Sequence, residues 1–232
     1  MSQEILAAIF KLKDRHPVVF KDIIEKQYGS MAFKPDDAKD VSVLDLGAHV
    51  GLFSMFMLSH GAKAVVSVEA NPKTFLELAE NLLPFRNASF LNLAVTNGRS
   101  NTVRISDADA QSKIVQDQGA EVRTTTLEDL AALLPKDGPR LLKVDVEGAE
   151  YQILPETSGR TLRSFRTIFL ETHIIDAGPG RSYEFLKEYL ANLGFKETFR
   201  TPIFNWIWDK DGNVVDCKPI PNMGGWRFEL DR

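Results

Sequence analysis

The chain has 232 residues, a formal net charge of −4, a sequence pI near 5.6 and a single cysteine, Cys217. Its Lys and Arg residues are not clustered, so it lacks the basic footprint that nucleic-acid binding needs. One cysteine allows neither an intrachain disulfide nor a Cys-based metal site. We see no signal-peptide pattern and no apolar run of membrane-spanning length, and we therefore expect a cytoplasmic protein without nucleic-acid or membrane partners.

The length allows one large α/β domain with a small appendage. Residues 3–14 carry apolar side chains at helical spacing, and Pro17 can open a second helix that ends at Gly29. We therefore expect an N-terminal helical extension over residues 1–40 and a main domain over residues 41–232. The two helices are expected to pack against the edge of the sheet, and a lid over a bound ligand is the alternative.

The stretch from Val41 to Gly51, VSVLDLGAHVG, predicts a buried strand, a glycine turn and the start of a helix. That combination forms the ligand-binding corner of an open α/β sheet. The dinucleotide fingerprint G-x-G-x-x-G has a second glycine where a pyrophosphate approaches, whereas here His49 stands two residues after Gly47. The carboxylate of Asp45 also suits a cationic or hydroxyl-bearing ligand better than a phosphate.

A second apolar strand, Ala64–Glu69, ends in a carboxylate. Glu69 follows Gly51 by 18 residues, close to the ~20-residue offset at which such folds place an acid on ribose hydroxyls. A carboxylate accepts both O–H groups of a vicinal diol. A solvated strand end is the alternative, but the β-α-β context favours the ribose role.

Strands and helices alternate along the rest of the chain, which indicates an α/β fold with five parallel strands. The further expected strands are 88–95, 101–106, 121–126, 140–146 and 165–173, with helices after Asn71, over 127–134, around Tyr151 and over 182–193, and a final antiparallel hairpin of 195–201 and 203–208. Residues 107–120 stay open between a solvated loop and a mobile flap over an acceptor. No chemistry is assigned to the tail from Pro219.

Ionisable side chains gather at the ends of two later strands. Lys143, Asp145 and Glu147 alternate along one strand and so share a face. Three charges inside a covered sheet are costly unless they are paired or bind a ligand. We expect Asp145 and Glu147 to face the crevice, with Lys143 deeper and paired to one of them. Glu171 and His173 end the next strand in the same way.

The groups at this rim include many acids, no arginine and no phosphate cradle. They are Asp45, Gly47, Gly51, Glu69, Asp145, Glu147, Glu171 and His173. A ligand matched to them carries a ribose diol and a positive charge, and S-adenosylmethionine has both. An NAD-dependent oxidoreductase is disfavoured, because His49 stands in the middle of the turn.

Five motifs carry a resemblance to a known family. They are VLDLGAHVGLFS at 43–54, VEANP at 68–72, NLAV at 92–95, TTL at 125–127 and LKVDVEGAE at 142–150. Through them the chain resembles the FkbM-type class I methyltransferases between about Val41 and Phe195. The resemblance implies a three-layer Rossmann-like, seven-stranded methyltransferase sheet, mostly parallel with a C-terminal antiparallel hairpin. It also implies S-adenosylmethionine as donor and a hydroxyl acceptor on a sugar or secondary metabolite.

The resemblance implies roles for residues by their motif position. Asp45, Gly47 and Gly51 line the methionine part of the cofactor, Glu69 binds the ribose, Ala70 and Ala94 contact the adenine, and Asp145 lies at the reacting end. His49 belongs to the same cofactor turn and stands where the family usually has Asn.

We expect in-line methyl transfer to a hydroxyl of a small-molecule or glycan acceptor, with a base that takes the proton. His173 is the first candidate for this base because its unperturbed pKa lies near neutrality, and Glu171, Glu147 and Asp145 are rivals. No metal is assigned, although Asp145, Glu171 and His173 holding a divalent ion is an open alternative. Transfer to nitrogen or carbon, and a non-catalytic binding module, also stay open, as does the oligomeric state.

Overall fold

The computed structural model describes residues 9, 11–17, 35–108, 112–173, 182–208 and 214–231, with the backbone alone described for residues 35, 201–208 and 214–224. The helix expected between Pro17 and Gly29 lies outside these ranges except for Pro17 itself. No helix within the described ranges is both long and apolar enough to cross a membrane.

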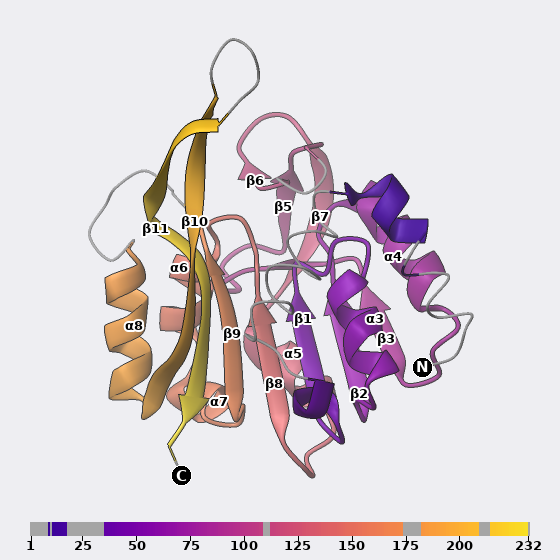
Figure 1. Ribbon diagram of the computed structural model, residues 1–232. Coiled ribbons are helices and arrows are strands. Elements are labelled where there is room, and N and C mark those ends of the chain that lie inside the picture. The colour runs from indigo at the N-terminus through magenta and orange to yellow at the C-terminus, as the bar shows by residue number, and fades with distance from the viewer. Residues whose placement is uncertain are drawn as a thin grey trace.

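A seven-stranded sheet organises the chain (Figure 1). Its order is β10-β11-β9-β8-β1-β2-β3, and its strands are β1 (Ser42–Leu46), β2 (Ala64–Val68), β3 (Ala88–Leu91), β8 (Arg140–Val144), β9 (Thr167–Thr172), β10 (Phe195–Trp208) and β11 (Val214–Leu230). From β3 to β9 the neighbours are parallel, and β11 runs antiparallel to both β9 and β10. The predicted parallel sheet is confirmed. Its strand order reverses beside β1, where open α/β sheets bind their ligands.

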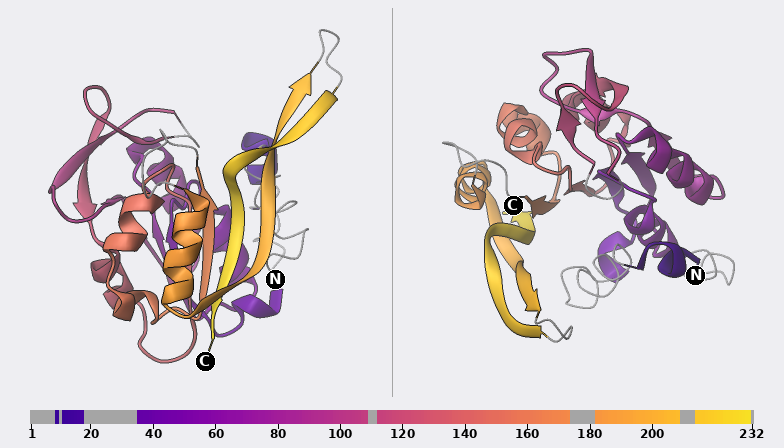
Figure 2. Two further views of the ribbon diagram at one scale, coloured as in Figure 1. Left: turned by 90° about the vertical axis from the view of Figure 1, so that its left-hand side faces the viewer. Right: turned by 90° about the horizontal axis from the view of Figure 1, so that it is seen from above.

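Helices cover both faces of this sheet. They are η2, a 3-10 helix (Pro35–Ala38), α3 (Leu52–Ser59), α4 (Pro72–Leu82), α5 (Leu127–Leu133), α6 (Glu150–Glu156), α7 (Gly159–Leu162) and α8 (Tyr183–Asn192). Seen from above, α6 and α8 lie on one side of the sheet and α3 lies on the other (Figure 2). The predicted three-layer arrangement is therefore confirmed.

The side chains of each strand alternate between two buried clusters. Leu44, on β1, packs with the helices α5, α6, α7 and α8. Val43, its neighbour on the same strand, packs with α3 and α4 on the other face. Because successive side chains of a strand point to opposite faces, the apolar runs of β1, β2 and β8 supply both clusters at once.

A smaller sheet follows the third parallel strand, and here one expectation was wrong. Residues 88–95 were expected to form a single strand, but the structure divides them into β3 and β4 (Ala94–Val95). Asn92 donates from Nδ2 to the carbonyl oxygens of Glu69 and Ala70, at 2.9 and 3.1 Å. These two hydrogen bonds hold the chain where it leaves the main sheet.

The smaller sheet has the order β4-β7-β5-β6 and stands above the carboxyl ends of the parallel strands (Figure 1). Its other strands are β5 (Thr102–Ile105), β6 (Ile114–Val115) and β7 (Ala120–Thr125). The expected strand over 101–106 thus belongs to this second sheet. Part of the segment 107–120, left open between loop and flap, forms β6.

The expected C-terminal hairpin was assigned to the wrong residues. Residues 195–201 and 203–208 are one continuous strand, β10, and its partner is β11 in the tail, to which we had assigned nothing. The expected division fell at Pro202, which has no N–H group to donate. In the structure it only accompanies a register shift between Pro202 and Phe204, which an edge strand tolerates. The hairpin extends beyond the other strands of the main sheet (Figures 1 and 2).

The described N-terminal residues pack against the second helical layer. Ile9 and Leu12 are buried in the cluster formed with α3 and α4. His16 Nε2 lies 3.0 Å from Glu77 Oε1 of α4, and the His16 ring meets the His49 ring edge-on at 5.4 Å. The segment therefore touches the glycine turn as well as the helices.

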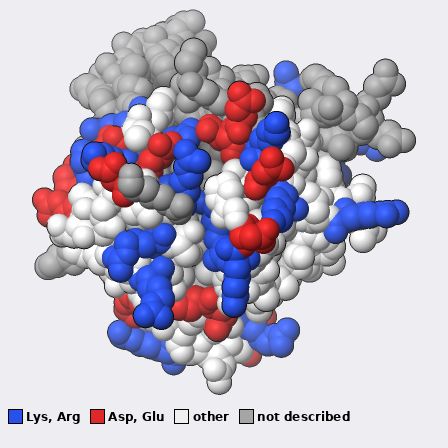
Figure 3. Space-filling view, turned by 90° about the horizontal axis from the view of Figure 1, so that it is seen from below, with Lys and Arg blue, Asp and Glu red and all other residues white. Residues whose placement is uncertain are grey.

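The face seen from below carries charges of both signs side by side (Figure 3). Lys63 pairs with Asp137, and Lys196 pairs with Asp231. This mixture fits the absence of basic clustering in the sequence.

Trp226 holds β11 against β9 and α8, and its removal is expected to destabilise the fold. The side chain is 1% exposed, stacks on Tyr183 at 3.6 Å between ring centroids and donates from Nε1 to Thr172 Oγ1 at 2.9 Å. We expect Trp226→Ala to lower the free energy of unfolding by about 3–5 kcal/mol, measured by chemical denaturation. Trp226→Phe keeps an apolar ring and serves as control with a smaller loss. A cost below about 1 kcal/mol for the alanine variant contradicts this assignment.

Candidate active site

The first turn of the site follows β1 and contains three left-handed residues. Gly47, His49 and Gly51 have φ values of 73°, 51° and 89°. The N–H groups of Gly47 and Ala48 both donate to the Val68 carbonyl at 3.0 Å, which ties the turn to the end of β2. A Cβ atom on Gly47 would lie 1.7 Å from the Asp145 carbonyl oxygen, so only glycine fits there.

A buried lysine connects this turn to β8. Lys143 Nζ lies 3.3 Å from Asp45 Oδ1 and donates to Asp145 Oδ2 at 3.2 Å and to the Gly47 carbonyl at 3.1 Å. Burial disfavours its charge, but the carboxylates of Asp145 and Asp45 outweigh that effect and raise the Lys143 pKa. The expected pairing of Lys143 with a neighbouring acid is present.

Asp45 does not face the crevice. Its side chain is fully buried, and Oδ2 accepts a hydrogen bond from Ser54 Oγ at 2.7 Å. Its other carboxylate oxygen faces Lys143, which also donates to the Gly47 carbonyl. A direct contact with the cofactor stays a prediction that this burial disfavours.

Glu69 lies against the first turn, as its offset from the turn predicted. Its Oε2 accepts from the N–H of His49 at 2.9 Å, and its Oε1 accepts from the N–H of Asn71 at 2.7 Å. Burial raises the Glu69 pKa to about 7, against the lowering effect of these two hydrogen bonds. Each carboxylate oxygen has a second acceptor position, so two hydroxyl donors can still be accommodated.

Ala70 and Ala94, expected near the adenine, meet in one small apolar cluster with Ile105 and Val122. Ala94 is buried as a whole residue, whereas Ala70 is half-buried. The segment after β5 reaches the same corner, because Asn71 Nδ2 donates to Ser112 Oγ at 2.8 Å.

The second turn follows β8 and brings four expected residues together. His173 Nε2, at the end of β9, lies 3.4 Å from Glu147 Oε1 and 3.7 Å from Asp145 Oδ1. Glu147 has a positive φ of 51°, which turns its side chain away from the line of the strand. Possible metal-ligating atoms of Asp145, Glu171 and His173 all lie within 4.8 Å of one another. The sequence-predicted acids and histidine therefore form one constellation at the carboxyl ends of β8 and β9.

Burial and mutual charge shift the pKa values of this constellation in different directions. Burial opposes a charge on His173, but the hydrogen bond with Glu150 and the charges of Asp145, Glu150 and Glu147 raise its pKa to about 10. Burial raises the pKa of Glu147 to about 7, and burial with the nearby charge of Asp145 raises that of Glu171 to about 8. At neutral pH the histidine is thus a cation, and the two glutamates titrate near neutrality.

Three contributors to the site escaped the sequence analysis: Ser54, Ser112 and Glu150. Ser54 ends the first motif of the resemblance and Ser112 stands in the weakly periodic segment 107–120, but nothing in the sequence singled out either residue. Glu150 ended the motif that carried the resemblance, but its contact with His173 joins residues 23 positions apart. Only the assembled sheet shows these contacts.

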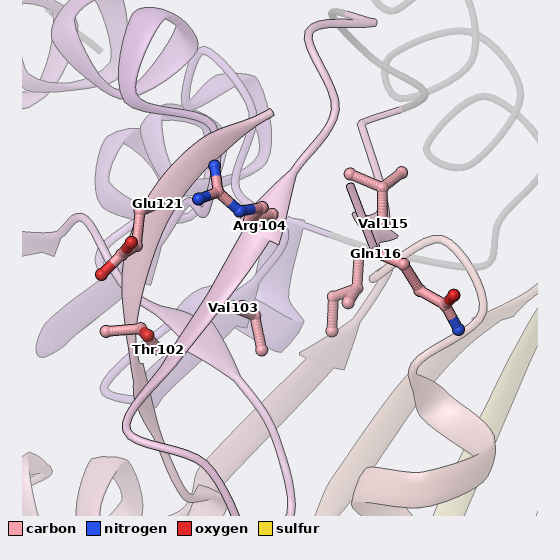
Figure 4. A pocket seen from close by; sticks show the side chains of 7 residues that line it. Thr102, Val103, Arg104, Val115, Gln116 and Glu121 are labelled. Carbon is pink, nitrogen blue, oxygen red and sulfur yellow. The ribbon is translucent and has the colours of Figure 1, made fainter. Parts of the chain in front are cut away.

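A separate cavity of about 270 Å³ lies between β5, β6 and β7 (Figure 4). It is lined by Thr102, Val103, Arg104, Ile114, Val115, Gln116 and Glu121. None of the predicted site residues lines it. Three of its residues belong to the segment 107–120, which the sequence had left open as a possible flap.

The comparison with known families agrees with this geometry. Residues 45–197 match the FkbM methyltransferase domain. The chain belongs to the FkbM methyltransferase family. Its methyl donor is therefore S-adenosylmethionine, as the strand-end chemistry predicted. No curated protein matches the sequence of this FkbM-family methyltransferase.

Several solved structures of methyltransferases are similar to this chain. The S-adenosylmethionine-dependent methyltransferase from Agrobacterium tumefaciens has 12% identity and a TM-score of 0.50, over 88% of this chain and 62% of that chain. A putative RNA methyltransferase from Pyrococcus horikoshii matches with 16% identity and a TM-score of 0.48, over 91% and 84% of the two chains. A precorrin-6Y C5,15-methyltransferase from Geobacter metallireducens matches with 13% identity and a TM-score of 0.47, over 84% and 81%. At 12% identity the first likeness supports the fold alone.

Gly47→Ala is expected to disrupt the site, because its Cβ would collide with the Asp145 carbonyl. Gly61→Ala is the matched control, since Gly61 also has a positive φ but its Cβ would meet nothing closer than 3.9 Å. The control carries only the backbone cost of about 1–2 kcal/mol. Chemical denaturation should show a loss at Gly47 that exceeds the loss at Gly61 by more than about 2 kcal/mol. Calorimetry should also show weaker S-adenosylmethionine binding at Gly47 alone, and equal losses at the two positions contradict the collision.

Proposed function

We propose that this methyltransferase transfers a methyl group to a hydroxyl of a sugar-like or secondary-metabolite acceptor, with a carboxylate as base. The proposal rests on the constellation of Glu147, Glu171 and His173 at the carboxyl ends of β8 and β9. It lies beside Asp145, whose carboxylate pairs with the buried Lys143. The cluster is acidic and partly buried, which suits an acceptor that must lose a proton as it is attacked.

The residues of the first turn fit the cofactor. Gly47 lets the first turn lie directly against the Asp145 carbonyl of the second turn, and Glu69 offers two oxygens to a ribose diol. When bound, S-adenosylmethionine supplies an electrophilic methyl group on a sulfonium that leaves as a neutral sulfide. The chain's own task is to align the acceptor with that methyl group and to exclude water.

The bound cofactor would supply the methyl group to the acceptor oxygen and would leave as a neutral sulfide, while a carboxylate of the site would take the hydroxyl proton. Glu147 and Glu171 are the proposed acceptors of this proton, because their raised pKa values of about 7 and about 8 match the task near neutral pH. His173, with a pKa of about 10, is already protonated and is better suited to hold the carboxylates than to accept a proton.

A metal-assisted reaction is the second candidate. It is supported by the group of Asp145, Glu171 and His173, which combines oxygen and nitrogen ligands within 4.8 Å. In this variant Asp145, Glu171 and His173 would hold a divalent ion, which would acidify the hydroxyl. Loss of turnover in EDTA with recovery on adding Mg²⁺ or Mn²⁺ selects it, and full turnover in EDTA selects the metal-free reaction.

The acceptor class is tested by methyl transfer itself. The purified protein is incubated with S-adenosylmethionine labelled in the methyl group and with sets of hydroxylated sugars, glycans and phenolic or macrolide-like metabolites. Label in an ether, identified by mass spectrometry, supports the proposal. Label on nitrogen or carbon identifies a methyltransferase of another acceptor class. Failure to bind either S-adenosylmethionine or its demethylated product at millimolar concentration overturns the assignment as an active methyltransferase.

Glu69→Ala is expected to weaken S-adenosylmethionine binding by roughly 10- to 100-fold, because it removes the acceptor of two ribose hydroxyl groups. Isothermal calorimetry measures the change. Glu80→Ala, on the exposed face of α4, is the control and should bind as the wild type does. Equal affinity of the Glu69 variant and the wild type removes the ribose assignment.

The base assignment predicts a pH dependence. Only an ionised carboxylate accepts a proton, so turnover should rise from pH 6 to pH 9 as Glu147 and Glu171 lose their protons. Glu147→Gln or Glu171→Gln should lower turnover roughly 100-fold or more at whichever position is the base, with the cofactor affinity nearly unchanged. His173→Ala should also lower turnover and leave cofactor binding intact. Single-turnover assays with calorimetry separate the two effects, and loss of cofactor binding in the His173 variant contradicts its placement at the reacting end.

A further inference from the structure

Glu150 is a fully buried carboxylate at the start of α6, and the expected roles do not include it. Its two oxygens serve two different segments. Oε2 accepts from the N–H of Gly148, in the second turn, at 2.8 Å. Oε1 accepts from the N–H of His173, at the end of β9, at 2.8 Å and lies 3.3 Å from Nδ1 of the same residue.

A carboxylate at the first turn of a helix is favoured by the helix dipole alone, and such a residue usually points to solvent. Glu150 instead has no exposed surface, and the cost of burying its charge must be offset by donors. Two backbone N–H groups and one imidazole provide them. The arrangement therefore depends on the second turn and the end of β9 being in fixed positions at the same time.

The contact with Nδ1 decides which way the imidazole faces. With Nδ1 directed at Glu150, Nε2 lies on the opposite edge of the ring, 3.4 Å from Glu147 Oε1 and 3.7 Å from Asp145 Oδ1. The contact with Gly148 acts on the other partner, because Gly148 directly follows Glu147 in the turn. One carboxylate thus orients both sides of the His173–Glu147 contact.

We propose that Glu150 is a positioning residue, which fixes the ring of His173 and the Glu147–Gly148 turn in one mutual arrangement at the reacting end. The inference rests on the proposed function for its effect on turnover. The orienting role itself is argued only from the contacts of Glu150 with Gly148 and His173. Glu150 touches neither cofactor nor acceptor in this role, and acts through His173 and Glu147.

The first measurement uses the wild-type protein and needs no acceptor. In proton–nitrogen correlation spectra of the histidine rings, with His173→Gln to assign the signal, His173 should show an Nδ1–H proton shifted downfield by a bond to a carboxylate. In Glu150→Gln this signal should move or broaden, because an amide keeps the size but can accept on only one of its two sides. Glu150→Asp keeps the charge and should restore the signal in part.

The second measurement is turnover against cofactor affinity. Glu150→Gln should lower methyl transfer at least about tenfold and leave S-adenosylmethionine affinity within about twofold, since Glu150 lies at the reacting end and not beside Glu69. Glu156→Gln is the matched control, because Glu156 lies at the other end of the same helix and pairs with Arg99 at the surface. It should leave the His173 signal, turnover and affinity unchanged.

An unshifted His173 proton in the wild type, or the same His173 signal in Glu150→Gln as in the wild type, overturns the inference. Equal losses of affinity and turnover in Glu150→Gln also overturn it, because they indicate a general structural role. These outcomes are distinct from failure of the proposed function, which is shown by absence of cofactor binding or methyl transfer in the wild type. If Glu150→Gln does not fold, the His173 signal in the wild type and in Glu150→Asp still tests the orienting role of Glu150.

Discussion

The site depends on the ion pairs and the hydrogen bond that the buried ammonium group of Lys143 makes. This side chain lies inside the sheet at 1% exposure, within reach of Asp45, Asp145 and the Gly47 carbonyl. A buried lysine is tolerated only where its charge is matched and its protons are bonded. The strands β1 and β8 are therefore constrained to the one register in which two carboxylates and a carbonyl reach the same cation. Both turns of the active site begin at the ends of these strands.

More acidic than basic side chains surround this cation, and this excess explains the raised pKa values of Glu147 and Glu171. Lys143 and His173 face Asp45, Asp145, Glu147, Glu150 and Glu171. The two bases lower the Asp145 pKa in spite of its burial, whereas Glu147 and Glu171 keep raised values. Such a site is preorganised for positive charge. In the proposed reaction, these surroundings favour a sulfonium cofactor and leave a carboxylate with the basicity that a proton transfer needs.

The sequence predicted those parts of the structure whose causes are local. Apolar runs and the polar groups that end them predicted the five parallel strands, Glu69 beside the first turn and the pairing of Lys143. The burial of Asp45 did not follow from the sequence, because it involves Ser54, a residue of the next helix. Glu150 was missed because its partner is on β9. The strand β11 was missed because two prolines and two adjacent glycines conceal its alternation, and its place between β9 and β10 is set by long-range pairing.

The pairing of β11 has a consequence for how the active site is made. Gly225 lies opposite Glu171 and Gly224 opposite Thr172, so the strand that carries the last catalytic candidates is completed only by the tail of the chain. During synthesis, β9 leaves the ribosome before β11, so the edge of β9 that later pairs with β11 is unpaired until the tail is made. Contacts of this sequence separation form slowly, and an open edge strand invites association with other chains. A nascent chain stalled before residue 224 should therefore be a substrate for chaperones, and the reacting end of the enzyme should be the last part of the fold to mature.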